Sequence, residues 1–115
     1  MGGLRLRDGR IDPAELEALT GLARHPRVYV KLGPIHALGG GGRPFAGTEP
    51  LLRAVVSAFG ADRCMWESDS GGPVLMADPA RDLPAAVDVI RKAGFLTDAE
   101  KRAILYSTAR RLLWP

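Results

Sequence analysis

The chain has 115 residues, which is enough for one small domain with a modest hydrophobic core. Hydrophobic residues make up 46% and charged residues 25% of the chain, an ordinary balance for a globular protein that argues against intrinsic disorder. The net charge of +3 comes from basic residues scattered along the sequence, so the composition favours no nucleic-acid partner.

Neither a membrane segment nor a secretion signal is evident. No stretch approaches the roughly 20 apolar residues of a membrane-spanning helix, and the first ten residues lack the apolar core of a signal peptide. These features predict a cytoplasmic protein with no membrane partner. The single cysteine, Cys64, lies in an apolar run and is expected to be a buried thiol without a disulfide partner.

The first predicted helix begins at Asp12, an acidic N-cap residue that is followed by Pro13 and by a glutamate three residues after the cap. Apolar residues at helical spacing continue to about Arg24. Pro26 then ends the helix, because the residue before a proline avoids helical angles. Residues 28–32 are rich in β-branched and aromatic side chains and predict a short strand.

A long loop is predicted after this strand. Residues 33–47 contain four consecutive glycines and two prolines, a composition typical of a mobile segment without regular structure. Thr48 is then expected to cap a second helix, which carries a broad apolar stripe and ends at Gly60. Residues 63–66 form a second predicted strand. They show no polar alternation, so we expect both faces of this strand to be buried, as in a parallel sheet.

The remaining chain is predicted to be helical after one more loop. Residues 67–79 are rich in glycine, proline and aspartate, and a third helix is expected from about Asp82 to Gly94. Thr97 opens a capping box for a last helical stretch that reaches Leu113. This order of elements predicts an α/β fold. The loops that follow the strands are the long ones, as at the functional, carboxyl-terminal face of an α/β barrel.

The segment with the clearest chemical content is the second strand with the residues after it. The strand predicted over residues 63–66 is followed, after Glu67 and Ser68, by Asp69, just before a flexible loop. A carboxylate on a rigid strand end is suited to bind a divalent metal or to accept a proton from water. The alternative is an aspartate that caps the turn by accepting backbone N–H bonds.

Three stretches resemble the amidohydrolase-related superfamily of TIM-barrel hydrolases, the branch that includes lactone hydrolases and decarboxylases. Their order and spacing are similar to the seventh strand, the eighth strand and the closing helix of that family. The resemblance covers about residues 28–113, which is about three quarters of the chain. The stretches are residues 26–33 (PRVYVKLG), 58–69 (AFGADRCMWESD) and 109–113 (ARRLL).

The resemblance implies a role for Asp69. It corresponds to the eighth-strand aspartate of the family, which acts as a general base or as a metal ligand, with zinc or manganese as the metal in a complete enzyme. Lys31, at the end of the first predicted strand, and His36, in the loop after it, are weaker candidates for substrate binding. An outward-reaching lysine and a surface histidine are the competing interpretations.

The chain departs from the family pattern around Asp69. Glu67 stands where the family usually has glycine, and Ser70 with residues 71–73 replaces an aromatic residue and a proline. A second carboxylate at Glu67 either raises the pKa of Asp69 by repulsion or points into solvent, and we favour solvent.

The histidines of the family's site are also missing. The family builds its metal site from histidines on its first, fifth and sixth strands, whereas this chain has only His25 and His36, neither at a matching place.

A different hypothesis comes from residues 69–74, DSGGPV, which are similar to the segment around the nucleophilic serine of chymotrypsin-like proteases. In that case Ser70 would be the nucleophile. The protease pattern needs a glycine where this chain has Ser68, and β-strands where this chain continues into predicted helices. The protease fragment is therefore a remote alternative.

Together these features predict a partial TIM barrel, with residues 1–115 forming a single C-terminal part of an amidohydrolase-related domain. Two strands leave edges and faces exposed, which predicts marginal stability, self-association or pairing with a separately encoded N-terminal portion. Residues 1–3 look like the continuation of a sixth-strand motif, so we expect Met1 to be an internal or misassigned start or the gene to be truncated.

The expected activity is that of a hydrolase. Water would attack a lactone, ester or amide carbonyl of a small-molecule substrate, with Asp69 handling the proton, and the chain by itself is expected to be inactive. The alternative is a non-catalytic remnant that serves as a binding or assembly module. Metal analysis separates the two: stoichiometric zinc or manganese that is lost on Asp69→Asn would support the enzyme.

Overall fold

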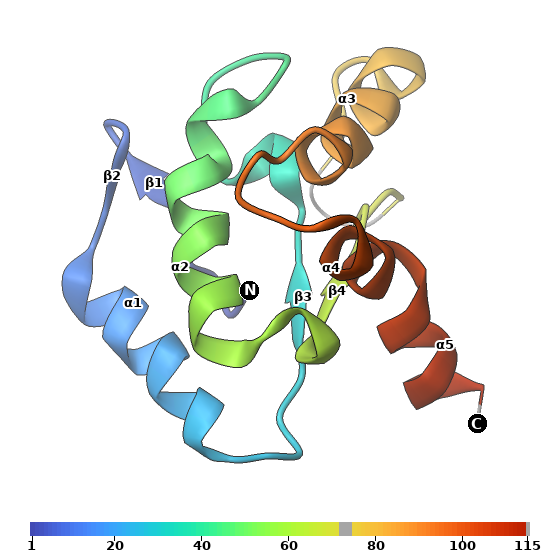
Figure 1. The fold of residues 1–115 in the computed structure, drawn as a ribbon. Coiled ribbons are helices and arrows are strands. Elements are labelled where there is room, and N and C mark those ends of the chain that lie inside the picture. Colours follow the sequence, from blue (N-terminus) through green and yellow to red (C-terminus); the bar gives the residue numbers. More distant parts are fainter. Residues whose placement is uncertain (72–74, 115) are drawn as a thin grey trace.

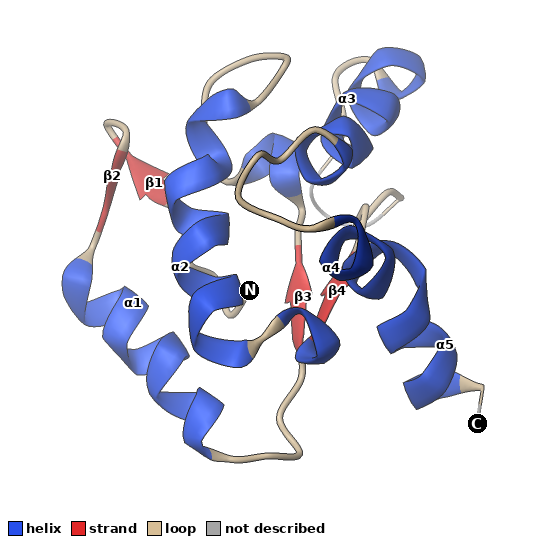
Figure 2. Ribbon diagram, viewed as in Figure 1, coloured by secondary structure: helices blue, strands red, loops and turns tan. Residues whose placement is uncertain are grey.

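A computed structural model describes residues 1–71 and 75–114 of the chain. Two short parallel strands lie side by side near the middle of the molecule, with helices on either side of them (Figure 1). Helices predominate, and the strands form two separate pairs (Figure 2). The elements in chain order are β1 (Leu6–Arg7), β2 (Arg10–Ile11), α1 (Pro13–Thr20), β3 (Val30–Leu32), α2 (Glu49–Phe59), β4 (Cys64–Trp66), α3 (Pro79–Arg91), α4 (Asp98–Arg102) and α5 (Thr108–Leu113).

The central sheet consists of β3 and β4, which run parallel as predicted, with α2 in the connection between them. Lys31 pairs in register with Met65, and side chains of paired residues in a parallel sheet point to the same face. Their neighbours along the strands belong to the main hydrophobic core or pack against it: Val30, Leu32, Cys64 and Trp66. The sheet therefore has a core face and a second face, on which Lys31 is exposed.

Helix α1 begins where the sequence predicts. The Asp12 carboxylate accepts the backbone N–H groups of Ala14 and Glu15 at 2.9 and 3.2 Å, and Pro13 occupies the first turn. A 3-10 turn over Gly21–Arg24 completes the predicted helix. In Figure 1, α1 and the β1–β2 hairpin lie on the far side of α2 from the central strands.

Helix α2 buries the predicted apolar stripe: Leu51, Leu52, Val55, Val56 and Phe59. It ends at Gly60, whose φ of +79° requires glycine in practice. Thr48 occupies the N-cap position of this helix, as expected from the sequence, but its side chain makes no capping hydrogen bond. Its hydroxyl is buried and donates to the carbonyl of Phe45 at 2.7 Å, because the preceding loop folds back into a 3-10 turn, Ala46–Thr48.

Helix α3 begins at Pro79, three residues before the predicted start at Asp82. A proline fits the first turn of a helix, since the missing N–H has no partner there in any case. The Asp82 carboxylate then accepts the backbone N–H of Asp78 at 2.9 Å and so closes the first turn from inside the helix. The sequence pattern placed Asp82 at the start of the helix, whereas it lies within the first turn.

The final helices follow the predicted capping box. The Thr97 hydroxyl accepts the N–H of Glu100, and the Glu100 carboxylate accepts the N–H of Thr97. A π-helical turn over Ala103–Ser107 joins α4 to α5. The buried Thr108 hydroxyl donates to the carbonyl of Ala61 at 3.3 Å, which fastens α5 to the start of β4.

The β1–β2 hairpin was not predicted. Its turn residues, Asp8 and Gly9, both have positive φ, at 50° and 72°. An Asp-Gly pair between alternating apolar and polar residues is a strong hairpin signal, so the sequence did contain the information.

The loop after β3 is more ordered than its composition predicts. It contains a 3-10 turn at Ile35–Ala37, and Ile35, Leu38 and Phe45 are buried in the core. At Gly39, with φ of +84°, a Cβ atom would lie 2.2 Å from the carbonyl oxygen of Leu6. Several glycines here permit close packing rather than mobility.

Among residues 1–71 and 75–114, no helix combines the length and apolar character that crossing a bilayer requires.

Candidate functional site

The carboxyl ends of β3 and β4 meet at a small cavity that contains Asp69. Gly33 follows β3, and Glu67 and Asp69 follow β4. The cavity has a volume of about 220 Å³ and is referred to below as the Asp69 cavity. Its lining comes from the strand ends, from the loop after β3 and from the first residues of the chain: Met1, Gly3, Leu4, Arg5, Gly33, Pro34, Ala37, Leu38, Glu67 and Asp69.

The two strand ends approach each other closely because residue 33 is glycine. The N–H of Glu67 donates to the carbonyl of Leu32 at 3.4 Å. A Cβ atom on Gly33 would lie 2.4 Å from the carbonyl oxygen of Glu67 and 2.6 Å from its Cγ. No side chain fits at this position without a shift of the backbone. Gly33 therefore sets the width of the cavity floor, a role that sequence reasoning did not assign to it.

Glu67 forms an ion pair with Lys31 across the two strands. Lys31 Nζ lies 2.5 Å from Glu67 Oε2, and the side chains are 62% and 17% exposed. The hydrogen bond with Glu67, and then its charge, raise the pKa of Lys31, and the charge of Asp69 adds to the effect. The expectation that Glu67 points into solvent is wrong, because the cationic partner on the adjacent strand holds the carboxylate over the sheet.

Asp69 is half-buried and has left-handed backbone angles, with φ of +52°. Aspartate tolerates this region better than most residues. The turn after β4 is stabilised by Ser68, whose hydroxyl oxygen accepts the N–H of Ser70 at 3.1 Å. Within the part of the chain that the structure describes, no N–H group donates to the Asp69 carboxylate. The interpretation of Asp69 as a turn cap therefore finds no hydrogen bond in its favour among those residues.

His36 lies in the 3-10 turn after β3 and faces a different cavity from Asp69. Both of its ring nitrogens are buried, and neither has a hydrogen-bond partner among the described residues. The expectation of a surface histidine is therefore wrong. His25, by contrast, is exposed and accepts a hydrogen bond from Arg24 at the end of the first helical segment.

Ser70 is exposed, and no histidine contacts it among residues 1–71 and 75–114. Gly72, Pro73 and Val74, which complete the protease-like motif, lie outside the described residues. A parallel strand pair surrounded by helices is not the all-β fold of chymotrypsin-like proteases. The protease alternative is therefore wrong about the fold.

The described residues do not gather a metal site by themselves. No group of three or more histidine, cysteine, aspartate or glutamate side chains comes together among them. A zinc or manganese site needs about three or four protein ligands, to which Asp69 can contribute one carboxylate.

The sequence matches the family model described as amidohydrolase over residues 1–113. The chain belongs to the amidohydrolase family. A comparison with curated proteins found no match. Membership of the amidohydrolase family confirms the resemblance that the strand and helix motifs indicated, and the match extends N-terminally from them to residue 1. Asp69, Lys31 and His36 all lie within the matched range. The match does not assign catalytic or binding roles to them.

Proposed function

We propose that the chain forms part of a hydrolase active site in which Asp69 accepts the proton of an attacking water molecule. The observation that carries the proposal is the position of Asp69. It lies three residues after the end of β4, lines a cavity at the carboxyl ends of two parallel strands, and has no hydrogen-bond donor among the described residues. Active sites of α/β barrels lie at this end of the strands.

In the proposed reaction, water attacks the carbonyl carbon of a lactone, ester or amide while the Asp69 carboxylate takes one proton. The tetrahedral intermediate then expels the alcohol or amine, which receives the proton back from Asp69. Lys31 is proposed to contact an anionic group of the substrate, although its ammonium pairs with Glu67 and it does not line the Asp69 cavity. The enzyme class and the substrate-binding roles of Lys31 and, more weakly, His36 are parts of this proposal.

The fold proposal is a partial TIM barrel. Lys31 and Met65 share the face of the sheet opposite the helix-covered core, and this face would point to the interior of a complete barrel. The other strands would come from chain segments that pair with the edges of β3 and β4, either from an N-terminal portion or from another copy. We expect little activity from the 115 residues alone. A cytoplasmic location remains a prediction.

Members of this family are commonly metal-dependent. In a complete enzyme zinc or manganese would polarise the carbonyl or the water, and Asp69 is the described residue with the position and chemistry of a ligand. The remaining ligands are not found among the described residues.

The test is an assay of hydrolysis on a panel of lactones, esters and amides. The protein is purified from the cells that naturally produce it, together with any other protein that copurifies. Asp69→Asn should lower kcat at least about 100-fold, the usual contribution of a general base. The matched control is Asp62→Asn, because Asp62 is exposed and precedes β4 at the opposite strand end. Equal activity of the two variants would contradict the proposal.

A non-catalytic binding or assembly module is the second candidate, and the small number of possible metal ligands favours it. Metal analysis of the same preparations separates the two. Zinc or manganese in stoichiometric amount that disappears in Asp69→Asn supports the enzyme. Activity on no member of the panel, together with stable association of the chain with a partner, supports the module.

A further inference from the structure

Beside the Asp69 cavity lies a second cavity, of about 340 Å³, on the other side of the turn Ile35–Ala37. It is referred to below as the Arg43 cavity. Ala37 lines the first cavity and His36 the second, so this single turn separates them. The polar side chains that line the Arg43 cavity are those of His36, Arg43 and Asp82, and Gly41 and Gly42 add backbone groups.

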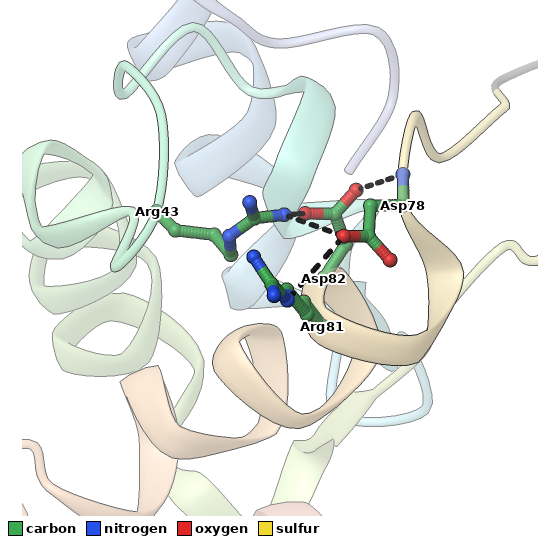
Figure 3. A network of polar contacts seen from close by, with 4 residues as sticks. All are labelled: Arg43, Asp78, Arg81 and Asp82. Carbon is green, nitrogen blue, oxygen red and sulfur yellow. Dashed lines mark hydrogen bonds and ion pairs between the residues drawn. The ribbon is translucent and has the colours of Figure 1, made fainter.

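Arg43 is held in place by two aspartates of the α3 segment (Figure 3). Its Nη1 lies 2.5 Å from Asp82 Oδ1 and 3.9 Å from Asp78 Oδ2. Asp78 also pairs with Arg81 at 3.7 Å. Two arginines and two aspartates thus balance each other in charge. The network joins the glycine-rich loop after β3 to the first turn of α3.

Both carboxylate oxygens of Asp82 are engaged within this network. Asp82 Oδ1 accepts from Arg43, and Oδ2 accepts the backbone N–H of Asp78 at 2.9 Å. The hydrogen bond from Asp78 and the contacts with Arg43 lower the pKa of Asp82, so it is a carboxylate at neutral pH. Its side chain is only 8% exposed. Asp82 therefore serves to hold Arg43 rather than to bind a ligand.

The donors of the cavity, in contrast, are unused. Among residues 1–71 and 75–114, Arg43 donates only through Nη1, so the Nε and Nη2 side of the guanidinium has no partner. Both nitrogens of His36 are buried without a partner, and at least one of them carries a proton. The amide groups of Gly41 and Gly42 also donate to no described residue. Of these donors the His36 nitrogens are buried, whereas Arg43, Gly41 and Gly42 are exposed to solvent. A buried donor without an acceptor is unfavourable, and an incoming acceptor would relieve this at His36.

The frame around these donors is well determined. Phe45 is buried and has φ of +61°, a left-handed conformation that is costly for an aromatic residue. Its N–H donates to the carbonyl of Gly42, and its own carbonyl accepts both the N–H and the hydroxyl of Thr48. These bonds hold the loop beside Arg43 in one conformation, so the donors are oriented before a ligand arrives.

We propose that the Arg43 cavity binds the carboxylate group of a small organic acid. The exposed edge of a fixed guanidinium matches a carboxylate with two parallel N–H···O bonds, and His36 supplies a further donor. Binding of a carboxylate in the Arg43 cavity does not depend on hydrolysis at Asp69. A substrate with a carboxylate or a separate effector would both satisfy it.

The two histidines of the chain make a direct test possible, because His25 is exposed and lies outside the cavity. Succinate is titrated into the isotope-labelled full chain at constant ionic strength, and the NMR signals of the His36 ring and of Arg43 Nε–H are followed. Saturable shifts at His36 and Arg43, with His25 unchanged, support the proposal. Equal shifts at both histidines, or shifts that do not saturate, overturn it.

Variants identify the groups that bind. Arg43→Lys keeps the charge facing Asp82 but loses the planar fork, and should weaken succinate binding about tenfold. Arg81→Gln is the matched control, since Arg81 belongs to the same network but does not line the cavity, and should bind within about twofold of the wild type. Binding by Arg43→Lys at wild-type strength overturns the assignment.

A second variant guards against a folding defect in the first. His36→Phe keeps an aromatic ring in the turn and removes both nitrogens, and should weaken succinate binding several-fold when read at Arg43 Nε–H. Inorganic phosphate serves as the competing anion. Saturation by phosphate without saturation by succinate overturns the carboxylate class.

Discussion

Gly33 shows how one residue controls the geometry of the proposed site. Its hydrogen atom faces the backbone of Glu67, and a methyl group there would meet the carbonyl oxygen at 2.4 Å. Because the obstacle is backbone rather than a flexible side chain, the two strand ends would have to separate. The same movement would pull Glu67 away from Lys31 and widen the cavity beside Asp69.

Gly33→Ala is therefore expected to lower the free energy of unfolding by at least about 2 kcal/mol, the usual cost of overpacking against a backbone. Gly94→Ala is the matched control, because a Cβ at Gly94 meets nothing within 4 Å and its φ is not positive. Denaturant unfolding of both variants measures the difference. Similar midpoints for the two would show that the close approach of the strands is not a constraint.

Cys64 is a residue whose environment makes it chemically inert. Its side chain is fully buried between the sheet and the helices, and burial raises the pKa of the thiol to about 12. The thiolate is the reactive form of cysteine. We therefore expect the folded chain to resist thiol reagents at pH 8 and the unfolded chain to react at once.

The raised pKa of Cys64 also predicts how stability changes with pH. Above about pH 8.5 the unfolded thiol loses its proton while the folded thiol keeps it. This ionisation stabilises the unfolded state relative to the folded state. The contribution of Cys64 to the free energy of unfolding is therefore complete below about pH 8.5. It falls by up to about 1.4 kcal/mol per pH unit as the pH rises toward 12. Unfolding free energies of the wild type and Cys64→Ala between pH 7 and 10 check this. Parallel curves would contradict it.

At the scale of elements, the capping box at the start of α4 is a short motif whose effect can be measured. Thr97 and Glu100 satisfy each other's backbone N–H groups. These bonds, first from the Thr97 backbone and then from its hydroxyl, lower the pKa of Glu100. The stabilisation is therefore present above the ordinary pKa of glutamate and is lost as the pH falls through the lowered value.

Thr97→Ala should cost about 1 kcal/mol at pH 7, the usual value for removal of an N-cap hydroxyl. Thr20→Ala is a suitable control, because the Thr20 hydroxyl donates back to the carbonyl of Leu16 at 2.8 Å and caps no helix start. Thermal unfolding of both variants at pH 7 and at pH 3.5 gives the comparison. A cost for Thr97→Ala that does not shrink at the lower pH would argue against the role of Glu100.

At the scale of the whole molecule, a compact shape is combined with a small central sheet. The radius of gyration of 13.4 Å is about that of an independent domain of this length. Among the described residues, the central sheet nevertheless has two strands, and Lys31 on its second face is exposed. Several large apolar side chains are also exposed near the carboxyl terminus, namely Tyr106, Leu112, Leu113 and Trp114.

We therefore expect the isolated chain to be marginally stable and to associate, either with itself or with segments that extend the sheet. The denaturation midpoint should rise with protein concentration, because association stabilises the folded state by mass action. Chemical unfolding at protein concentrations that differ 50-fold, with sedimentation of the same samples, measures this. A monodisperse monomer with a concentration-independent, cooperative transition would contradict the prediction.

Local sequence patterns determined the main helices and the central strands of this protein, and they placed Asp69 after the second of these strands. Asp12 with Pro13, the Thr97 capping box and the glycine at position 60 each specify a helix boundary through hydrogen bonds or backbone angles between near neighbours. The buried run before Asp69 likewise predicted a parallel strand. These signals act over a few residues, so they can be read without the fold.

Only the tertiary structure decided which side chains meet. The pairing of Lys31 with Glu67, and of Arg43 with Asp82, joins residues that are far apart in the chain, and no local pattern specifies such partners. The burial of His36 likewise depends on how a glycine-rich loop packs against α3 rather than on its own sequence. Solvent exclusion and charge pairing at the strand ends are properties of several segments at once, and for that reason they emerge only when the chain has folded.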